Sequence, residues 1–293
     1  MVTNISATTC WNSDDVRSDL EADTPAAVAA ARPLVEFRDL GVIYPGGIAA
    51  VKNFNLSVSA GEFVVILGPS GCGKSTVLQV VAGLLQPTSG RVEVAGKINP
   101  PPGKDRGFVF QHAGLLPWFD IFTNIEIGLR AKGMSRKAAR AVSQRHVSAM
   151  GLEGFGHLYP HQLSGGMQQR VGVARAFAID PPILLMDEPF AALDAQTRLL
   201  LQEELIRLWE GSGKTIIFVT HSIEEAVFLA DRVVVMARAP GSVKASVDIM
   251  LPRPRSEKTR SHPAYLNLFN TLWGMIRLDA QRAISETDLS ENA

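Results

Sequence analysis

A glycine-rich loop is the first stretch of this sequence whose residue types and spacing could do chemistry. It reads GPSGCGKS over residues 68–75, between the apolar run FVVIL and a helical pattern, and it matches G-x-x-x-x-G-K-[ST] in the context that this pattern requires. Its glycines let the backbone wrap phosphates without Cβ clashes, and its N–H groups then form an anion nest. We expect Lys74 to reach the β- and γ-phosphates of a nucleotide, Ser75 to bind Mg²⁺ and Thr76 to contact the α-phosphate.

Two adjacent acids end a second apolar run, ILLMDEP, over residues 183–189. Carboxylates at the C-terminal end of a central parallel strand lie beside the phosphate loop in open α/β folds. We therefore expect Asp187 to hold Mg²⁺, directly or through water, and Glu188 to polarise the attacking water as a general base. Without the phosphate loop, the same pair would be interpreted as a solvated strand end.

A second candidate anion site lies in LSGGMQQR, residues 163–170, which runs straight into the apolar-periodic segment VGVARAFA. The pattern predicts a helix whose N-terminus carries Ser164, Gly165 and Gly166 and offers free backbone N–H groups to an anion. The alternative is a helix-capping turn that binds no ligand.

Strands and helices must position these loops. Apolar runs of strand length alternate with helical patterns in the first part of the chain and again from ILLMD onward, where TIIFVT and RVVVM follow. Between them lies a helix-rich stretch, about residues 112–176, in which Ser135 is a candidate N-cap and Gly151 a candidate stop. The outline is an α/β core interrupted by a helical insertion.

The C-terminal segment predicts one more helix after the basic stretch LPRPR. Tyr265, Phe269, Leu272 and Ile276 share one face of that helix. We expect this face to pack on the core; a face that binds a membrane is the alternative.

Composition narrows the class of protein. Lys+Arg and Asp+Glu balance at 29 each, so the basic excess of most nucleic-acid binders is missing. Cys10 and Cys72 are the two cysteines, which cannot form a disulfide scaffold and fit a reducing compartment. The polar N-terminus lacks the pattern of a signal peptide, and no apolar run approaches the length of a membrane span. We expect a soluble cytoplasmic protein with a disordered extension over residues 1–33.

Together these motifs make the sequence resemble the nucleotide-binding subunits of ATP-binding-cassette (ABC) transporters, from about Leu34 to Pro254. LSGGMQQR matches the signature motif of that family, just ahead of ILLMDEP. Gln111 (the Q-loop), residues 191–194, AALD (the D-loop), and His221 (the switch histidine) complete the set in the family's order. Six linked motifs in one order make a chance match improbable.

The resemblance implies an α/β fold: a P-loop NTPase (RecA-like) core with an antiparallel β subdomain and an inserted α-helical signature subdomain. It implies an ABC ATPase domain over residues 34–254, whose helical part covers about residues 112–176. A helical tail would then occupy residues 255–293.

In this family two subunits dock head to tail, so the resemblance implies a site shared between two chains. Ser164, Gly165 and Gly166 of one subunit would contact the γ-phosphate that Lys74 of the other subunit holds. Asp194 would reach across the dimer and help to align the second site. ATP would then join the dimer, and hydrolysis would release it.

Further roles carry over from the resemblance. Tyr44 would stack on adenine, although a lone tyrosine in a strand also suits a core. Gln111 would bond Mg²⁺ and the lytic water, and His221 would contact the γ-phosphate or stabilise charge developing there. Bulky alkylation of Cys72, inside the loop, should block ATP.

The expected sites can be collected in three groups. The expected catalytic residues are Lys74, Gln111, Glu188 and His221. The expected Mg²⁺ ligands are Ser75, Gln111 and Asp187. The expected ATP contacts are Tyr44, Gly68, Pro69, Ser70, Gly71, Cys72, Gly73, Lys74, Ser75, Thr76, Gln111, Ser164, Gly165, Gly166 and Asp194.

Partners also follow from the resemblance. With no fused membrane helices, the chain looks more like an importer subunit than a typical exporter, and its motifs look most like the nitrate/sulfonate/taurine importer ATPases. The implied function is ATP-driven uptake of such a small anion, at the cytoplasmic face of the membrane. The implied partners are a second identical subunit, integral membrane permease subunits and, indirectly, a periplasmic or extracellular solute-binding protein, with no nucleic acid. Exposed Trp118 and Phe119 would suit a permease helix, or else both pack in the core.

Other functions stay open at this point. One is a soluble ABC ATPase uncoupled from transport, although tandem cassettes and long coiled-coil insertions are missing. Others are an importer ATPase for a different small solute and a scaffold that binds ATP but hardly hydrolyses it, against which Glu188 and His221 argue. A GTPase would need an N-K-x-D guanine reader, and the sequence has none.

Overall fold

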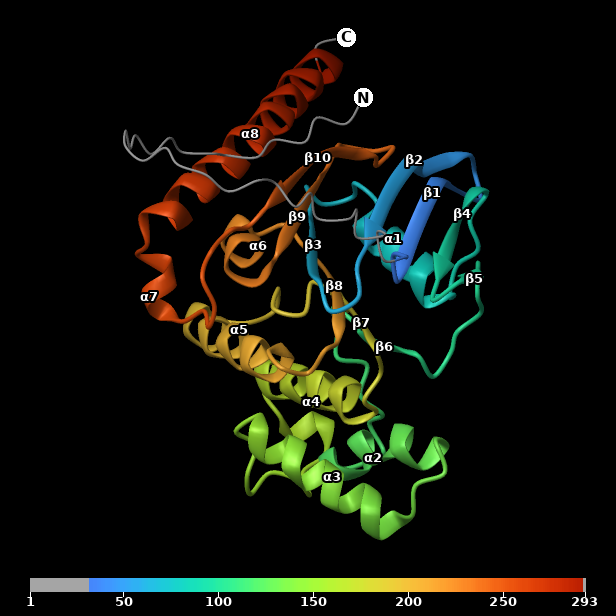
Figure 1. Ribbon diagram of the computed structural model, residues 1–293, viewed down its shortest axis with the longest axis vertical. Helices are drawn as coiled ribbons and strands as arrows, with labels where there is room; N and C mark the ends of the chain where they lie inside the picture. The colour runs from blue at the N-terminus through green and yellow to red at the C-terminus, as the bar shows by residue number, and fades with distance from the viewer. Residues whose placement is uncertain (1–31, 292–293) are drawn as a thin grey trace, which may run out of the picture.

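Two β-sheets lie on either side of helix α1 (Lys74–Ala82) in the computed structural model of the chain (Figure 1). The structure describes the backbone of residues 32–291 and the side chains of residues 32–277. The extension predicted for residues 1–33 thus lies almost wholly outside the described residues. Apolar side chains of α1, among them Val77, Leu78 and Val81, fill the space between the two sheets.

The smaller sheet is antiparallel, with strand order β2-β1-β4-β5. Along its long strands, buried and exposed side chains largely alternate, as in a sheet that packs one face on the core and exposes the other to solvent. The strands of this sheet are β1 (Val35–Tyr44), β2 (Ile48–Val58), β4 (Ser89–Val94) and β5 (Lys97–Ile98).

The larger sheet has strand order β10-β9-β3-β8-β7-β6 and is parallel except for the antiparallel edge strand β10. All residues of β3, β7 and β8 are buried, because layers cover both faces of the sheet. The strands are β3 (Phe63–Leu67), β6 (Arg106–Val109), β7 (Ile183–Asp187), β8 (Thr215–Thr220), β9 (Arg232–Met236) and β10 (Val243–Asp248).

Capping side chains fix where most helices begin. Asp120, Ser135, Ser164, Asp194 and Ser222 each precede a helix and accept a backbone N–H from the third residue along the chain. The five helices capped in this way are α2 (Ile121–Ala131), α3 (Arg136–Ala149), α4 (Gly165–Ala178), α5 (Ala195–Trp209) and α6 (Ile223–Leu229). The others after α1 are the 3₁₀ turn η1 (Pro160–Gln162), α7 (Glu257–Arg260) and α8 (Pro263–Glu291).

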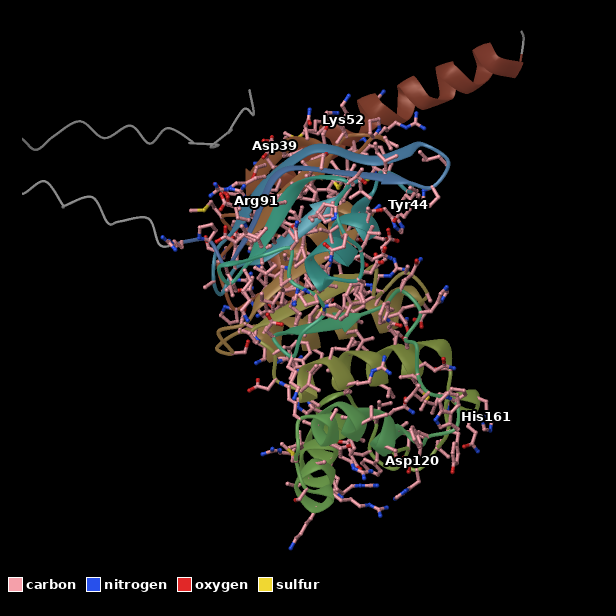
Figure 2. The ribbon with its side chains drawn as sticks, turned by 90° about the vertical axis from the view of Figure 1, so that its right-hand side faces the viewer. Asp39, Tyr44, Lys52, Arg91, Asp120 and His161 are labelled. Atoms are coloured by element: carbon pink, nitrogen blue, oxygen red, sulfur yellow. The ribbon has the colours of Figure 1, made fainter. Side chains whose placement is uncertain are left out.

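Helices α2, α3 and α4 form a block at one end of the molecule (Figure 1). The residues of these helices, 121–178, nearly coincide with the helical insertion predicted for about residues 112–176. The predicted division into an ATPase domain and a C-terminal tail stays a prediction. Figure 2 shows Asp120 and His161 in this helical block, while Tyr44 lies in the β-rich part. Within residues 32–291, no helix combines the length and the apolar character that a bilayer crossing needs.

The C-terminal helix α8 packs on the core through the face that the sequence analysis singled out. Tyr265 and Leu272 are buried, and Phe269 and Ile276 pack beside them against the main core. The hydroxyl of Tyr265 also donates to the carbonyl of Glu224 in α6, at 3.3 Å. The expectation that this face covers the core rather than a membrane therefore agrees with the structure.

This packing predicts that Leu272→Ala lowers the free energy of unfolding by about 2–4 kcal/mol, because it leaves a cavity under α8. Leu266→Ala, on the exposed face of the same helix, should change it by less than about 0.5 kcal/mol. Urea unfolding followed by circular dichroism measures both. Equal effects of the two substitutions would show that α8 is not packed in this way.

Candidate functional site

The glycine-rich loop opens onto a pocket of about 430 Å³, a size that suits a nucleotide. The residues that meet there come from the loop and the start of α1, from the end of β1 and the beginning of β2, and from the segments that follow β6, β7 and β9. The side chains and backbone that line it belong to Tyr44, Ile48, Ala49, Ala50, Ser70, Gly71, Gly73, Lys74, Ser75, Thr76, Gln111, Glu188 and Ala239.

Backbone geometry makes glycine necessary at the end of the loop. Gly73 has φ +96°, and a Cβ there would lie 2.6 Å from the carbonyl oxygen of Ala50. The N-terminus of α1, which follows, has no side-chain cap, so its N–H groups stay available to an anion. A side chain at Gly73 would therefore collide with β2, and the uncapped start of α1 leaves the loop open to an anion.

Lys74 is the cation of this pocket. Its side chain is only 4% exposed, and its ammonium group donates to the carbonyls of Gly68 and Pro69, each at 2.9 Å. The same nitrogen lies 3.3 Å from a carboxylate oxygen of Glu188. One buried charge thus joins the phosphate loop to the acid at the end of β7.

Ser75 and Asp187 form an oxygen pair beside Lys74. The hydroxyl of Ser75 donates to the carboxylate of Asp187 at 2.8 Å. Burial raises the pKa of Asp187, and the hydrogen bond from Ser75 opposes that rise. Hard oxygen donors of this kind fit Mg²⁺, which takes few protein ligands and completes its shell with water and phosphate oxygens. The described residues hold no cluster of three or more His, Cys, Asp or Glu side chains that could bind a metal ion.

Glu188 and His221 form a second pair, carried by the ends of β7 and β8. Nδ1 of His221 lies 2.8 Å from Oε2 of Glu188, and the histidine side chain is 53% exposed. Glu188 has φ +43°, a left-handed conformation that is rare for a residue of its size. Its backbone N–H donates to Val219 of β8 at 3.0 Å, which holds it in place.

Tyr44 and Gln111 complete the rim of the pocket. The hydroxyl of Tyr44 lies 3.1 Å from that of Thr76, so the aromatic ring is held at the entrance rather than in the core. Gln111 follows β6, is exposed and lines the same pocket. Both residues are therefore free to meet a ligand there.

The second candidate anion site lines a different pocket. Ser164, Gly166 and Asp194 gather there, with Met167 and Arg170 among their neighbours. The Ser164 hydroxyl accepts from Met167 N at 3.3 Å, so it does cap α4, which was the alternative interpretation of this stretch. Ser164, Gly166 and Asp194 thus line a different pocket from the one beside the phosphate loop.

Asp194 has a structural duty of its own. Its carboxylate caps α5 by accepting from Thr197 N at 3.0 Å, and this backbone hydrogen bond lowers the pKa of Asp194. The capping contact leaves a carboxylate, next to the signature helix, that stays charged.

Three loop residues expected to contact ATP do not line the pocket: Gly68, Pro69 and Cys72. The backbone carbonyls of Gly68 and Pro69 instead accept hydrogen bonds from the ammonium group of Lys74. Cys72 is 1% exposed, and its sulfur lies 2.8 Å from the position that a Cβ on Gly68 would take. Burial also raises the pKa of its thiol. An alkylating reagent would therefore have to reach a thiol that is buried and held in its neutral, less reactive form.

Sequence reasoning missed a group of polar residues behind His221. Thr220, Arg198 and Glu225 line a small cavity of about 40 Å³ together with Glu188 and His221. A glutamate on a short amphipathic helix normally indicates a solvated face, so nothing in the pattern of SIEEA pointed to a buried carboxylate.

Comparison with known proteins agrees with this geometry. Residues 51–191 match the profile of the ABC transporter family. The chain is 41% identical over 252 residues to the nitrate import ATP-binding protein of Synechocystis sp., covering 83% of this chain and 95% of that one. It is 47% identical over 197 residues to the taurine import ATP-binding protein of Yersinia pestis, covering 67% and 77%.

A solved structure gives the same fold. A dimeric ATP-binding cassette, in a post-hydrolysis state with ADP and Pi, superposes with a TM-score of 0.68 at 36% identity, covering 73% of this chain and 98% of that one. The predicted fold class, a P-loop NTPase core with an antiparallel β subdomain and a helical insertion, is therefore confirmed. The pocket, the motifs and the relatives lead to one conclusion: this chain belongs to the ATP-hydrolysing, ATP-binding proteins of the ABC transporter family.

Proposed function

We propose that this ATPase powers the import of a small anion, such as nitrate, a sulfonate or taurine, through a separate membrane permease. The observation that carries the proposal is the similarity, over nearly the whole cassette, to nitrate and taurine import ATP-binding proteins. A solute-binding protein outside the membrane would select the cargo. The ATPase itself would sit at the cytoplasmic face, held there by the permease.

The roles of the pocket residues are part of this proposal. Lys74 binds the β- and γ-phosphates, Tyr44 stacks on adenine, and Glu188 accepts the proton of the attacking water. The left-handed backbone of Glu188 supports its role, because such strain persists where a side chain is needed at one place. His221, 2.8 Å from Glu188, orients that carboxylate and meets the γ-phosphate.

Mg²⁺ would be held by Ser75, Asp187 and Gln111. When bound, it neutralises phosphate charge during phosphoryl transfer. Ser75 and Asp187 already meet at 2.8 Å, and Gln111 offers an amide oxygen from the rim of the same pocket.

Two copies of the chain would complete each ATP site. Ser164 and Gly166 line a different pocket from Lys74 of the same chain, which supports a contact between Ser164–Gly166 and the γ-phosphate held by a second chain. Gly165 supports a contact from outside: it has no positive φ, and no atom beyond its chain neighbours and the backbone of its own helix lies within 4 Å of where its Cβ would be. A residue so free of internal constraint leaves room for close approach of an anion to the tip of α4.

Trp118 is the proposed anchor for the permease. Its side chain is 66% exposed, while Phe119 beside it is at a ring-centroid distance of 6.2 Å. An exposed tryptophan on the helical block suits an aromatic contact at the centre of an interface.

We expect Glu188→Gln to bind ATP but to lose on the order of 10²-fold or more in turnover, because the general base is gone. The variant should accumulate as a closed dimer with ATP in the absence of Mg²⁺. Size-exclusion chromatography and a phosphate-release assay measure both effects. Glu224→Gln, the same change at an exposed glutamate, is the control. A Glu188→Gln variant that stays monomeric with ATP would count against the shared site.

We expect Ser164→Arg to abolish hydrolysis and to leave the affinity of the single subunit for ATP unchanged, because the substitution blocks only the partner's γ-phosphate. Ser135→Arg is a matched control, since Ser135 caps α3 with a hydrogen bond of the same length, 3.3 Å. Fluorescent-nucleotide titration and an ATPase assay separate binding from turnover. Equal loss of both in Ser164→Arg would contradict a site completed by a second chain.

We expect Trp118→Ala to lose co-purification with a polytopic membrane protein from detergent extracts of the native host, while the isolated subunit keeps its ATPase rate. Trp273→Ala, which removes an exposed tryptophan from α8, is the control. A wild-type chain that co-purifies with no membrane protein would favour an ATPase uncoupled from transport.

A further inference from the structure

A buried carboxylate lies directly behind the switch histidine. Glu225 of α6 is 4% exposed, and its Oε2 accepts from the hydroxyl of Thr220 at 2.6 Å. Thr220 is the last residue of β8 and immediately precedes His221. The catalytic histidine therefore leaves the sheet at a residue whose side chain is anchored to α6.

The Thr220 hydroxyl also holds the turn that contains His221. Its oxygen accepts from the backbone N–H of Ser222 at 3.0 Å, so a hydrogen bond spans the histidine. A hydroxyl has one proton and two lone pairs. Because Glu225 takes that proton, the lone pairs face Ser222, and the backbone at His221 is fixed.

The hydrogen bonds continue from Glu225 to the C-terminal tail. Nε2 of Gln202, in α5, donates to Oε1 of Glu225 at 3.4 Å. Nη2 of Arg260, in α7, donates to Oε1 of Gln202 at 2.7 Å. The guanidinium of Arg260 also lies 3.9 Å from the ring centre of Phe228 in α6. Four residues thus form a relay, which we call the tail relay: Arg260, Gln202, Glu225 and Thr220.

Hydrogen-bond chemistry gives the tail relay one direction. Arginine can only donate, so the oxygen of the Gln202 amide faces Arg260 and its nitrogen faces Glu225. Glu225 then receives a donor on each oxygen, one from Gln202 and one from Thr220. Only a group with two acceptors satisfies both donors.

Glu225 also shares an enclosed space with the catalytic pair. Glu225, Arg198, Glu188 and His221 all line the cavity of about 40 Å³ at the end of β8. Burial raises the pKa of Glu225, while Thr220, Arg198 and His221 oppose the rise and the charge of Glu188 adds to it. The carboxylate is therefore coupled electrostatically, as well as through Thr220, to the groups that surround the γ-phosphate.

We propose that the tail relay positions His221 for hydrolysis, so that the C-terminal segment beyond the cassette is part of what sets the turnover rate. The inference rests on the proposed role of His221. Arg260, Gln202 and Glu225 act as positioning residues, because none of them lines the nucleotide pocket.

A swap of one carboxylate between positions 225 and 202 tests this directly. In Glu225→Gln, the new amide has a single oxygen, so one of the two donors that the carboxylate satisfied loses its acceptor. In Gln202→Glu, two carboxylates face each other. In the double variant, the carboxylate at position 202 accepts from Arg260 and from the amide at position 225, whose oxygen accepts from Thr220. Every donor of the relay then again has an acceptor.

We expect each single variant to lose about tenfold in kcat with KM for ATP unchanged, because His221 is misplaced. The double variant should return to within about twofold of wild type, since the two substitutions compensate each other. Steady-state ATPase assays on the full chain measure all three variants.

Arg260→Met tests the tail end of the relay. Methionine keeps a long side chain against Phe228 and removes the donor to Gln202, so kcat should fall by about threefold to tenfold. Lys258→Met, which removes a charge from the same short helix at an exposed position, should keep the wild-type kcat. Both are measured on the full chain with Mg-ATP.

A readout without turnover separates this inference from the proposed function. The imidazole proton resonances of His221, assigned with His221→Ala, should shift in Glu225→Gln and return in the double variant. Unshifted resonances, a double variant no better than the single ones, or a wild-type kcat in Glu225→Gln would each overturn the tail relay. A wild-type chain that co-purifies with no membrane protein, while kcat and the His221 resonances follow the relay, would count against the proposed function alone.

Discussion

The parallel pairing of β3, β6, β7 and β8 is the constraint on which the site depends. Leu67 of β3 pairs with Thr220 of β8, Val219 with Asp187 of β7, and Met186 with Val109 of β6. Because the strands run in the same direction and end in register, the segments that follow them leave from one edge of the sheet. The phosphate loop, Gln111, Glu188 and His221 are consequently brought together by backbone hydrogen bonds alone, before any of their side chains touch.

A site built at the edge of a sheet is open to solvent on the side that faces away from the strands. The tip of α4, which has the chemistry to close it, belongs to the helical block and lies in another pocket of the same chain. In the proposed dimer, rigid strands fix one part of the phosphate environment, and the docking of a second chain supplies the rest. On that proposal, the arrival of the second chain is a step at which catalysis can be controlled.

Much of the fold and the phosphate site could be predicted from the sequence, because the signals were local. FVVIL reads as a buried strand, GPSGCGKS needs its glycines for backbone reasons, and the Ser75–Asp187 contact follows from a strand that ends beside a loop. Contacts that depend on distant packing were out of reach. Nothing in SIEEAVFLA says that Glu225 turns inward to Thr220, since that depends on α5, whose Gln202 donates to the same carboxylate. Nor does the loop sequence say that Cys72 is buried, while its neighbours on either side line the pocket.

The burial of the Cys72 thiol affects how readily the phosphate loop can be oxidised. A cysteine in a nucleotide-binding loop is an obvious point of attack for peroxide, which reacts with the exposed thiolate. Here the sulfur is packed beneath the loop, and burial keeps it in the neutral form. Energy supply to the transporter should therefore persist in a cell whose more accessible thiols have already become sulfenic acids.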